Sequence, residues 1–274
     1  MAHSGDDGRT PRTLEVRGPF TVADDASVGD WCIIGGANGP AVIESGCRLG
    51  DHAKIGGSVF LGSGSQVGDY VVLGHATKRL TTGHDPTETH GRAQRFLVRD
   101  GSTRIGPDAV LRSHSVVYLC VRVGSGLTTG HHVLIREHTT IGDRCIFGSY
   151  ASCDGYTVVG SDTHVGQYAQ LSQGARIGNG CFIGGHTVFS DNRMAVRIPD
   201  RDLDGAVVGD FVRIGLGCVI LPGVSIGEGA MVGAGSIVSR DVPSGVLAFG
   251  SPCRVIRSLQ PEELADYRDS FSTP

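Results

Sequence analysis

The sequence predicts an all-β protein in which short strands recur every six residues. Three observations support this fold class. Large apolar residues stand at six-residue intervals and each precedes a glycine, as at Leu49, Ile55, Leu61, Val67 and Leu73. The residue four positions after each apolar one is mostly small. The chain also has 43 glycines among 274 residues, roughly twice the usual share, without the Gly-X-Y period of collagen.

The six-residue repeat occupies three blocks, at residues 28–73, 105–189 and 208–238. The first block slips once, near residues 38–40, whereas the second keeps one register throughout, with Thr129 as its polar exception among the anchors. A period of six fits neither an α-helix nor a simple alternating strand, but it fits a short strand followed by a tight turn. We expect the apolar anchors and the small residues to point inward, and the glycine after each anchor to permit the turn.

The cysteines follow the same register, so we interpret them as reduced core residues. Five fall at the small inward position and one at an anchor: Cys32, Cys47, Cys145, Cys181 and Cys218, with Cys153 as the anchor. The chain has no Cys-x-x-Cys pair, which argues against a zinc-thiolate site or a disulfide framework. A reducing, cytoplasmic location fits this usage.

Residues 25–255, with their hexapeptide repeats, resemble the left-handed parallel β-helix acyltransferases. The resemblance implies three repeats per triangular coil, about ten coils, and residues 18 apart stacked on one another. It also implies a homotrimer with sites between subunits. Residues 1–24 are expected to be a lead-in, and residues 256–274 a tail with a short helix that starts near Pro261.

Two excursions interrupt the repeat, at residues 75–104 and 190–207. Both are polar, the first rich in Arg and His and the second in Arg. Long excursions from a regular scaffold are usually functional or disordered. We therefore expect both to be substrate loops.

The last coils resemble those of acyl-CoA-dependent hexapeptide transferases. The residues that carry this resemblance are the small residues of the segments Ile214–Cys218 and Val232–Ser236, together with the arginines that follow. The resemblance implies that Gly215, Gly233, Ala234 and Gly235 let the pantetheine arm approach closely, and that Arg240 and Arg254 meet the phosphates of CoA. Acetyl-CoA or another acyl-CoA is then the co-substrate, and no metal is expected.

Residues 129–142, TGHHVLIREHTTIG, resemble the branch that N-acetylates nucleotide-linked amino sugars. The turn at residues 189–192 lies where that branch has a turn before its loop. The resemblance implies a set of substrate-binding residues: His132, Arg136, Glu137, Tyr156, Asp191 and Asn192. The sequence does not identify the acceptor, the nucleotide or the length of the acyl group.

Ring residues 18 apart predict two ladders along the coils. The first contains His114, His132, Tyr150, Tyr168 and His186, and the second, partial one contains Cys120, His138 and Tyr156. Because residues 18 apart stack in this fold, each set should form one row on an edge. Such a row is either a subunit interface or the wall of a binding site, and the two roles are compatible in a trimer with sites between subunits.

Acyl transfer to nitrogen requires a neutral amine, so a nearby imidazole is a suitable base. His131 and His138 are the candidates, because both fall on the segment that resembles the amino-sugar branch. The alternative is that the amine arrives already deprotonated and no enzymic base is needed. Backbone N–H groups at a turn would stabilise the oxyanion.

Composition excludes several other classes. The net charge of −4 argues against a nucleic-acid partner. The sequence has no apolar run long enough to span a membrane, and no apolar signal core near its start. Three alternatives to an amino-sugar enzyme remain open: an acyltransferase for a non-sugar amine or hydroxyl, a metal enzyme like the γ-type carbonic anhydrases, and a non-catalytic β-helix scaffold.

Overall fold

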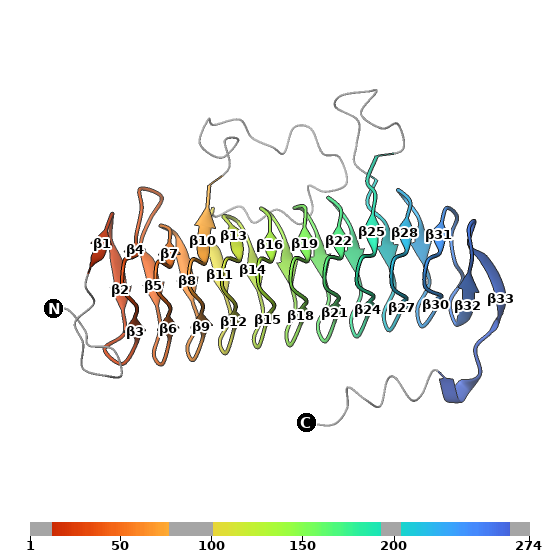
Figure 1. Cartoon of the computed structure of the whole chain (residues 1–274), viewed down its shortest axis with the longest axis horizontal. Helices are drawn as coiled ribbons and strands as arrows, with labels where there is room; N and C mark the ends of the chain where they lie inside the picture. The colour runs from red at the N-terminus through yellow and green to blue at the C-terminus, as the bar shows by residue number, and fades with distance from the viewer. Residues whose placement is uncertain (1–12, 77–100, 193–203, 264–274) are drawn as a thin grey trace.

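The chain winds through three short strands per coil, and equivalent strands of successive coils pair into three long sheets (Figure 1). The computed structural model describes residues 13–76, 101–192 and 204–263. The remaining residues, including most of both predicted excursions, lie outside this description.

The three sheets are named A, B and C in the order in which the chain meets them. Sheet A contains β1 (Leu14–Val16), β4 (Cys32–Ile34), β7 (Lys54–Ile55), β10 (Val72–His75), β13 (Val116–Tyr118), β16 (Leu134–Ile135), β19 (Ser152–Cys153), β22 (Gln170–Leu171), β25 (Val188–Phe189), β28 (Val219–Ile220) and β31 (Ile237–Val238). Sheet B contains β2 (Phe20–Val22), β5 (Ala41–Ile43), β8 (Val59–Leu61), β11 (Thr103–Ile105), β14 (Arg122–Val123), β17 (Thr140–Ile141), β20 (Val158–Val159), β23 (Arg176–Ile177), β26 (Val207–Val208) and β29 (Ser225–Ile226). Sheet C contains β3 (Ser27–Val28), β6 (Arg48–Leu49), β9 (Gln66–Val67), β12 (Val110–Leu111), β15 (Thr128–Thr129), β18 (Ile146–Phe147), β21 (His164–Val165), β24 (Phe182–Ile183), β27 (Arg213–Ile214), β30 (Met231–Val232), β32 (Val246–Phe249) and β33 (Arg254–Ser258).

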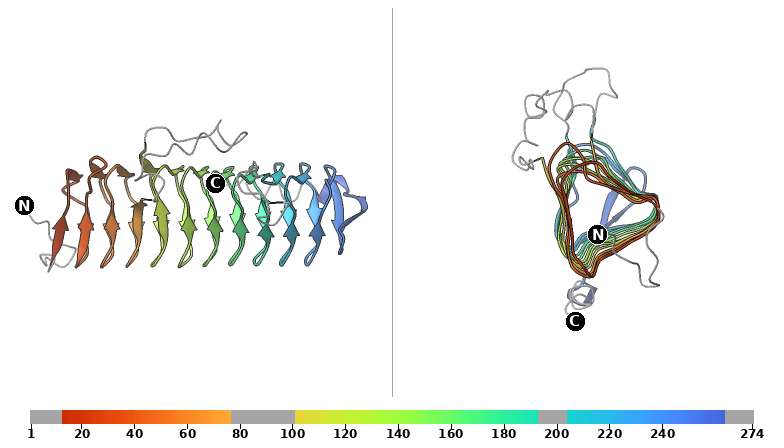
Figure 2. Two further views of the ribbon diagram at one scale, coloured as in Figure 1. Left: turned by 90° about the horizontal axis from the view of Figure 1, so that it is seen from above. Right: turned by 90° about the vertical axis from the view of Figure 1, so that its left-hand side faces the viewer.

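Seen along its axis, the molecule is a triangular prism with one sheet on each face (Figure 2). Neighbouring strands pair in parallel 18 residues apart, as Val116 does with Leu134 and Leu134 with Ser152. The predicted left-handed parallel β-helix is confirmed, with sheets of 11, 10 and 12 strands among the described residues. The three edges of the prism are called A–B, B–C and C–A after the sheets that meet there.

The predicted inward residues fill the core. Phe147, Ile135 and Leu171 are fully buried anchors. The small inward position does more than save space, because several side chains there donate a hydrogen bond to a carbonyl of the next coil. Cys145 Sγ lies 3.1 Å from the carbonyl oxygen of Gly160. Thr129, the polar anchor, is also buried, and its hydroxyl accepts the Arg112 N–H at 3.0 Å.

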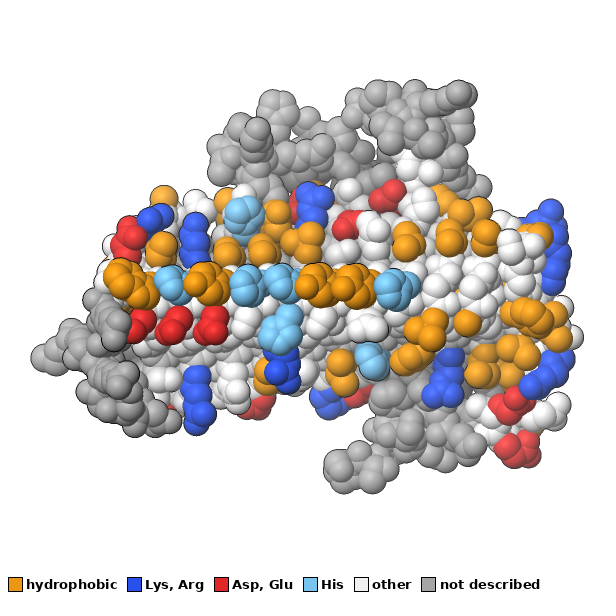
Figure 3. Space-filling view, in the orientation of Figure 1, with side chains coloured by type: hydrophobic (Ala, Val, Ile, Leu, Met, Phe, Trp, Pro, Cys, Tyr) orange, Lys and Arg blue, Asp and Glu red, His pale blue; other side chains and the backbone are white. Residues whose placement is uncertain are grey.

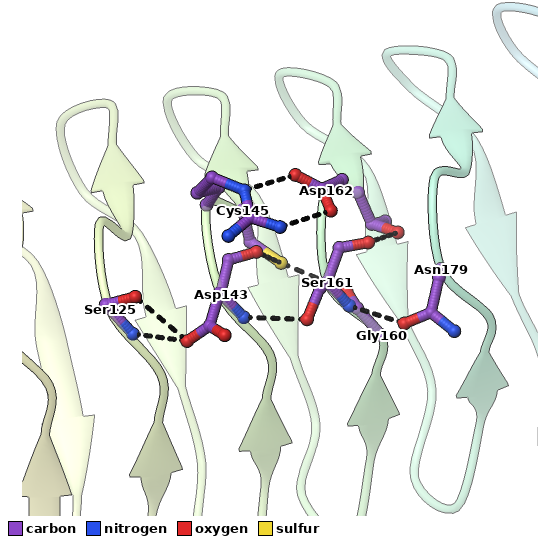
Figure 4. A network of polar contacts seen from close by, with 9 residues as sticks. Ser125, Asp143, Cys145, Gly160, Ser161, Asp162 and Asn179 are labelled. Carbon is purple, nitrogen blue, oxygen red and sulfur yellow. Dashed lines mark hydrogen bonds and ion pairs between the residues drawn. The ribbon is translucent and has the colours of Figure 1, made fainter. Parts of the chain in front are cut away.

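A polar ladder joins successive turns at the B–C edge (Figure 4). The N–H of Ser125 donates to Asp143 Oδ1 at 2.7 Å, the N–H of Asp143 donates to Ser161 Oγ at 3.0 Å, and the N–H of Ser161 donates to Asn179 Oδ1 at 2.9 Å. Each side chain thus satisfies a turn N–H of the preceding coil that no strand partner reaches. The ladder holds the turns of this edge in register.

The two ends of the β-helix differ from the sequence prediction. Parallel pairing starts at β1, which pairs with β4, so strands precede residue 25, where the sequence pattern placed the start of the repeat. At the other end β33 runs antiparallel to β32 and follows the last coil. A helical turn begins at Pro261, as predicted, and the described chain ends at Glu263.

Candidate functional site

The two excursions leave the scaffold at the same edge. The chain departs from sheet A after β10 and after β25, and in both cases it next enters sheet B, at β11 and at β26. Both connections therefore span the A–B edge. Residues 77–100 and 193–203 of these connections lie outside the described residues, so the prediction that they bind substrate stays a prediction.

The predicted second ladder lies on the A–B edge between the two excursions. The rings of His138 and Tyr156 stack with centroids 4.7 Å apart, and Cys120 occupies the same position one coil earlier. All three have a positive φ and all are nearly buried, with His138 at 5% exposure and Tyr156 at 8%. The ladder is therefore a packed column, with His138 in its middle.

Arg136 and Glu137 form a two-pronged ion pair beside this column. Arg136 Nη2 lies 2.9 Å from Glu137 Oε1, and Nε lies 3.2 Å from Oε2. Glu137 is only 8% exposed, and the Arg136 guanidinium also lies 5.8 Å from the centroid of the Tyr118 ring. Gly155 makes this packing possible, because a Cβ there would lie 3.0 Å from the carbonyl oxygen of Glu137. The pair is thus fixed in orientation rather than freely solvated.

Carboxylates gather on the same edge, next to the second excursion. Asp191 is half-buried, and this burial raises the pKa of its carboxyl, with the charge of Asp154 raising it further. Asp154 accepts a hydrogen bond from Gln170 Nε2 at 2.6 Å, and the Asp204 N–H donates to the Asp191 carbonyl at 3.0 Å. Asn192 follows Asp191 and ends the described segment. This side of the edge is suited to bind a cation such as an ammonium group.

His131 and His132 lie elsewhere, on the C–A edge at the opposite end of β16 from His138. The two candidate bases, His131 and His138, are therefore not brought together within one chain. His131 is exposed, and its backbone N–H donates to Ser149 Oγ at 3.1 Å. His132 belongs to the ring column described next.

The predicted first ladder is confirmed, and it is longer than the sequence indicated. It runs along the C–A edge through Trp31, His52, Tyr70, His114, His132, Tyr150, Tyr168 and His186. Apart from Trp31, at 6.4 Å from His52, successive centroids lie 4.6 to 5.1 Å apart. Figure 3 shows the row across the front of the molecule. We refer to these eight residues as the ring column.

Three of the six predicted CoA-binding residues line one groove on sheet C. The groove has a volume of about 340 Å³, and Gly215, Gly233 and Ala234 are in its lining. Its other walls were missed in the sequence and come from outward positions of sheet C and the residues beside them: Phe182, Arg213, Ile214, Met231, Val232 and Leu247. The outward position directly before an anchor is the signal that identifies Phe182, Arg213 and Met231.

The other three predicted CoA-binding residues are not in this lining. Gly235 lies on the C–A edge, Arg240 follows β31, and Arg254 begins β33 with its Nη1 2.9 Å from the Cys253 carbonyl oxygen. Both arginines are exposed. The groove is thus lined mainly by apolar and small residues, and Arg213 is its charged one.

Within residues 13–76, 101–192 and 204–263, no three His, Cys, Asp or Glu side chains are grouped as a metal site requires. No helix in that part of the chain has the length and hydrophobicity to cross a membrane.

Comparison with known proteins identifies the repeat. Residues 156–191 and 205–240 match the bacterial transferase hexapeptide family, described as six repeats. A galactoside O-acetyltransferase of Lactococcus lactis is 35% identical over 97 residues, which are 31% of this chain and 47% of that protein. A 2,3,4,5-tetrahydropyridine-2,6-dicarboxylate N-acetyltransferase of Staphylococcus aureus is 50% identical over 52 residues, 19% of this chain and 22% of that protein.

The chain thus spans less than half the length of these curated relatives. Among solved structures, a hexapeptide transferase family protein of Anaplasma phagocytophilum has a TM-score of 0.46 and 19% identity, over 56% of this chain and 87% of that one. The family match includes Gly215, Gly233 and Ala234 of the groove and Asp191 of the A–B edge. The chain is a left-handed β-helix whose later coils match the bacterial transferase hexapeptide repeats, and its resemblance to the hexapeptide acyltransferases is confirmed.

Proposed function

We propose that the protein is an acyl-CoA-dependent N-acyltransferase that acts on the amine of a nucleotide-linked amino sugar. The groove on sheet C carries this proposal. Its small residues, Gly215, Gly233 and Ala234, let an extended chain lie close to the backbone, and Phe182 and Met231 give it apolar walls. These features suit the pantetheine arm and acyl group of acetyl-CoA or another acyl-CoA.

The A–B edge is the proposed acceptor site. Asp191 and Asp154 attract the ammonium form of the substrate, while Asn192, Tyr156 and the Arg136–Glu137 pair contact the sugar or its phosphates. His132 was also expected to bind substrate, but it lies on the C–A edge. It therefore contacts the substrate only if a neighbouring subunit brings that edge close.

The groove and the A–B edge face away from each other within one chain. In a triangular prism the A–B edge lies across the core from sheet C (Figure 2). A complete site thus needs the groove of one chain and the A–B edge of another. This geometry supports a homotrimer with three sites between subunits, because a closed ring repeats the same heterologous contact.

In the proposed reaction, the amine nitrogen attacks the thioester carbonyl carbon and forms the new C–N bond. The amine proton passes to His138, the C–S bond breaks with its electron pair on sulfur, and the proton returns to the CoA thiolate. His131 is the alternative base, and an amine that arrives neutral needs neither. Turn N–H groups stabilise the oxyanion.

The test is turnover of acetyl-CoA with nucleotide-linked amino sugars as acceptors, in the wild type and in His138→Ala and His131→Ala. His138→Ala should lower kcat by about 10²- to 10⁴-fold, the usual contribution of a general base. Equal turnover in all three proteins would contradict an imidazole base. A loss confined to His131→Ala would place the base on the C–A edge.

A hydroxyl acceptor is the second candidate, because one of the relatives is named an O-acetyltransferase. Sugars that lack an amine distinguish the two, since an O-acyltransferase would acylate them and an N-acyltransferase would not. If neither class of acceptor is acylated, the reading as a metal enzyme or as a scaffold gains support instead.

A further inference from the structure

The ring column stops at His186, although the coils and the C–A edge continue. The two following coils place Gly217 and Gly235 at the ring position. The backbone register proves the equivalence: His186 donates its N–H to the Gln167 carbonyl at 2.9 Å, Gly217 to the Gly185 carbonyl at 2.9 Å, and Gly235 to the Leu216 carbonyl at 2.8 Å. Their φ angles, 65° and 70°, continue the 58° of His186.

The space above these glycines is open. A Cβ on Gly217 or on Gly235 would meet nothing within 4 Å. His186 is exposed, and one face of its ring stacks on Tyr168 with centroids 4.9 Å apart and planes inclined by 17°. Among the described residues no ring contacts its other face, so the column ends in an open aromatic surface. In Figure 3 the row of rings is followed by bare, pale surface toward the C-terminal coils.

The surroundings of this opening suit a nucleotide. Leu216, which is 61% exposed, precedes Gly217, and its Cδ2 would lie 3.5 Å from a Cβ on Gly185, the residue before the last ring. The groove begins at the adjacent residue, Gly215, and its lining contains Arg213. A planar ring and an apolar flank suit the stacking of a base, and Arg213, four residues before Gly217, is the charged residue of the adjoining groove and suits the phosphates.

We propose that the space over Gly217, against the open face of His186, binds the nucleobase of a nucleotide ligand as the next ring of the column. The strand spacing along the β-helix is about 4.8 Å, so one coil accommodates one ring. Two ligands of the proposed reaction share this chemistry: the adenine of acyl-CoA and the base of a nucleotide-linked sugar. The inference concerns binding alone and does not require acyl transfer.

The sharpest test fills the space with a side chain. Gly217→Tyr should extend the column at the usual cost of this positive φ, because the same turn position already holds Tyr150 and Tyr168 at φ 63° and 57°. Gly245→Tyr is the matched control, since Gly245 has φ 63°, nothing within 4 Å of a Cβ, and a place on the B–C edge. His186→Asn removes the platform while tolerating a positive φ, and His186→Tyr keeps it.

Binding is measured by calorimetry with adenosine 3′,5′-bisphosphate, with UDP, dTDP and GDP, and with 4′-phosphopantetheine, which lacks a base. At least one nucleotide should bind the wild type, and Gly217→Tyr and His186→Asn should weaken that binding by roughly 5- to 100-fold, the range of base stacking. Gly245→Tyr and His186→Tyr should stay within about threefold of the wild type. If the variants bind adenosine 3′,5′-bisphosphate more weakly, the base in this space is the adenine of CoA. If they bind a nucleoside diphosphate more weakly, it is the base of the nucleotide-linked acceptor.

Three results would overturn the proposal: no nucleotide binds the wild type, Gly217→Tyr binds nucleotides as the wild type does, or 4′-phosphopantetheine loses as much affinity as the nucleotides. In the last case the space holds the pantetheine arm and not a base. None of these results by itself contradicts acyl transfer, because acetyl-CoA turnover is measured separately. The thermal midpoint of Gly217→Tyr checks that the fold is intact.

Discussion

At the scale of single residues, the C–A edge combines an unfavourable backbone with a favourable stack. The ring residues of this edge have φ between 57° and 65°, a region that costs an L-residue roughly 1–2 kcal/mol. Stacking on both neighbours offsets this cost, since aromatic pairs contribute roughly 0.5–1.5 kcal/mol beyond their area. The balance explains how rings persist where glycine would be the usual choice.

Tyr150 tests this balance, because it stacks on His132 and on Tyr168 at 4.8 Å each. Tyr150→Ala loses both stacks and keeps the positive φ, whereas Tyr150→Gly loses the stacks and relaxes the backbone. We expect the glycine variant to be more stable than the alanine variant by about 1 kcal/mol in urea unfolding. An alanine variant equal to or more stable than the glycine variant would show that the positive φ costs nothing here.

Asp191 predicts a pH dependence of stability. Burial raises its pKa in the folded chain, so the folded state binds this proton more tightly than the unfolded state. The stability that the protonated Asp191 carboxyl contributes is therefore fully present below its pKa in the unfolded chain, which is about 4, and it is lost as the pH rises through the raised pKa of the folded chain. Asp191→Asn should be more stable than the wild type at pH 7, with the difference shrinking toward pH 4.

Asp143 is the matched control for this pH series, because its pKa is shifted in the opposite direction. The hydrogen bond from the Ser125 N–H lowers the pKa of Asp143 in the folded chain. Asp143 therefore contributes to stability above its pKa in the unfolded chain, and this contribution is lost as the pH falls through its lowered pKa in the folded chain. Asp143→Asn should therefore be less stable than the wild type at pH 7. If Asp191→Asn were less stable than the wild type at pH 7, the prediction would be wrong, and the Asp191 carboxylate would make a stabilising contact in the folded chain.

At the scale of elements, the six-residue register predicted the strands of the second and third blocks, because one buried anchor per strand determines which face points inward. The same register missed the first strands, since β1 (LEV) and β2 (FTV) have no glycine after them. It also missed Trp31, His52 and Tyr70 of the ring column. The slip near residues 38–40 and the first excursion change the spacing between coils, although each of the three follows a Gly-Asp pair.

The sequence predicted less of the candidate site than of the fold. A spacing of 18 residues predicted the column of His138 and Tyr156. The Arg136–Glu137 pair, and the effect of the Asp154 charge on the pKa of Asp191, depend on turn conformations that the register does not specify. His131 and His138 are seven residues apart in one segment, yet a strand places them on different edges. The excursions contribute no regular pattern, so their roles remain predictions.

The burial of the cysteines predicts how many thiols react in the native protein. None of the eight cysteines forms a disulfide: Cys32, Cys47, Cys120, Cys145, Cys153, Cys181 and Cys218 are buried, and Cys253 is partly exposed. Burial raises the pKa of Cys145 to about 11 and that of Cys181 to about 12, so these thiols are not nucleophilic at neutral pH. Ellman's reagent should titrate one thiol per native chain, and all eight after unfolding. Rapid reaction of several thiols in the native protein would contradict the packing.

At the scale of the whole molecule, the proposed site is divided between chains, and a mixture of defective subunits tests that division. Ala234→Asp blocks the groove, and His138→Ala disables the A–B edge. The Ala234→Asp change should preserve the fold, because Asp30, Asp51 and Asp69 occupy the same turn position in earlier coils. Each variant alone should be nearly inactive.

Unfolding and refolding the two variants together should restore activity. In a randomly mixed closed trimer, about a quarter of the interfaces join an intact groove to an intact edge, so the mixture should regain about a quarter of wild-type activity. Separate refolding followed by assay is the control. A mixture as inactive as its parents would mean that both halves of the site act from one chain.

Binding of acetyl-CoA tests the central claim most directly, because every other proposal about the reaction depends on the groove. Calorimetry with the wild type should show saturable binding of about one acetyl-CoA per chain, and each of the three interfaces of a trimer supplies one such site. Ala234→Asp should abolish it, while Ser149→Asp, which introduces an aspartate at the same turn position away from the groove, should leave it unchanged. Absence of binding to the wild type at millimolar acetyl-CoA, or equal binding by all three proteins, would contradict the assignment of the groove as an acyl-CoA site.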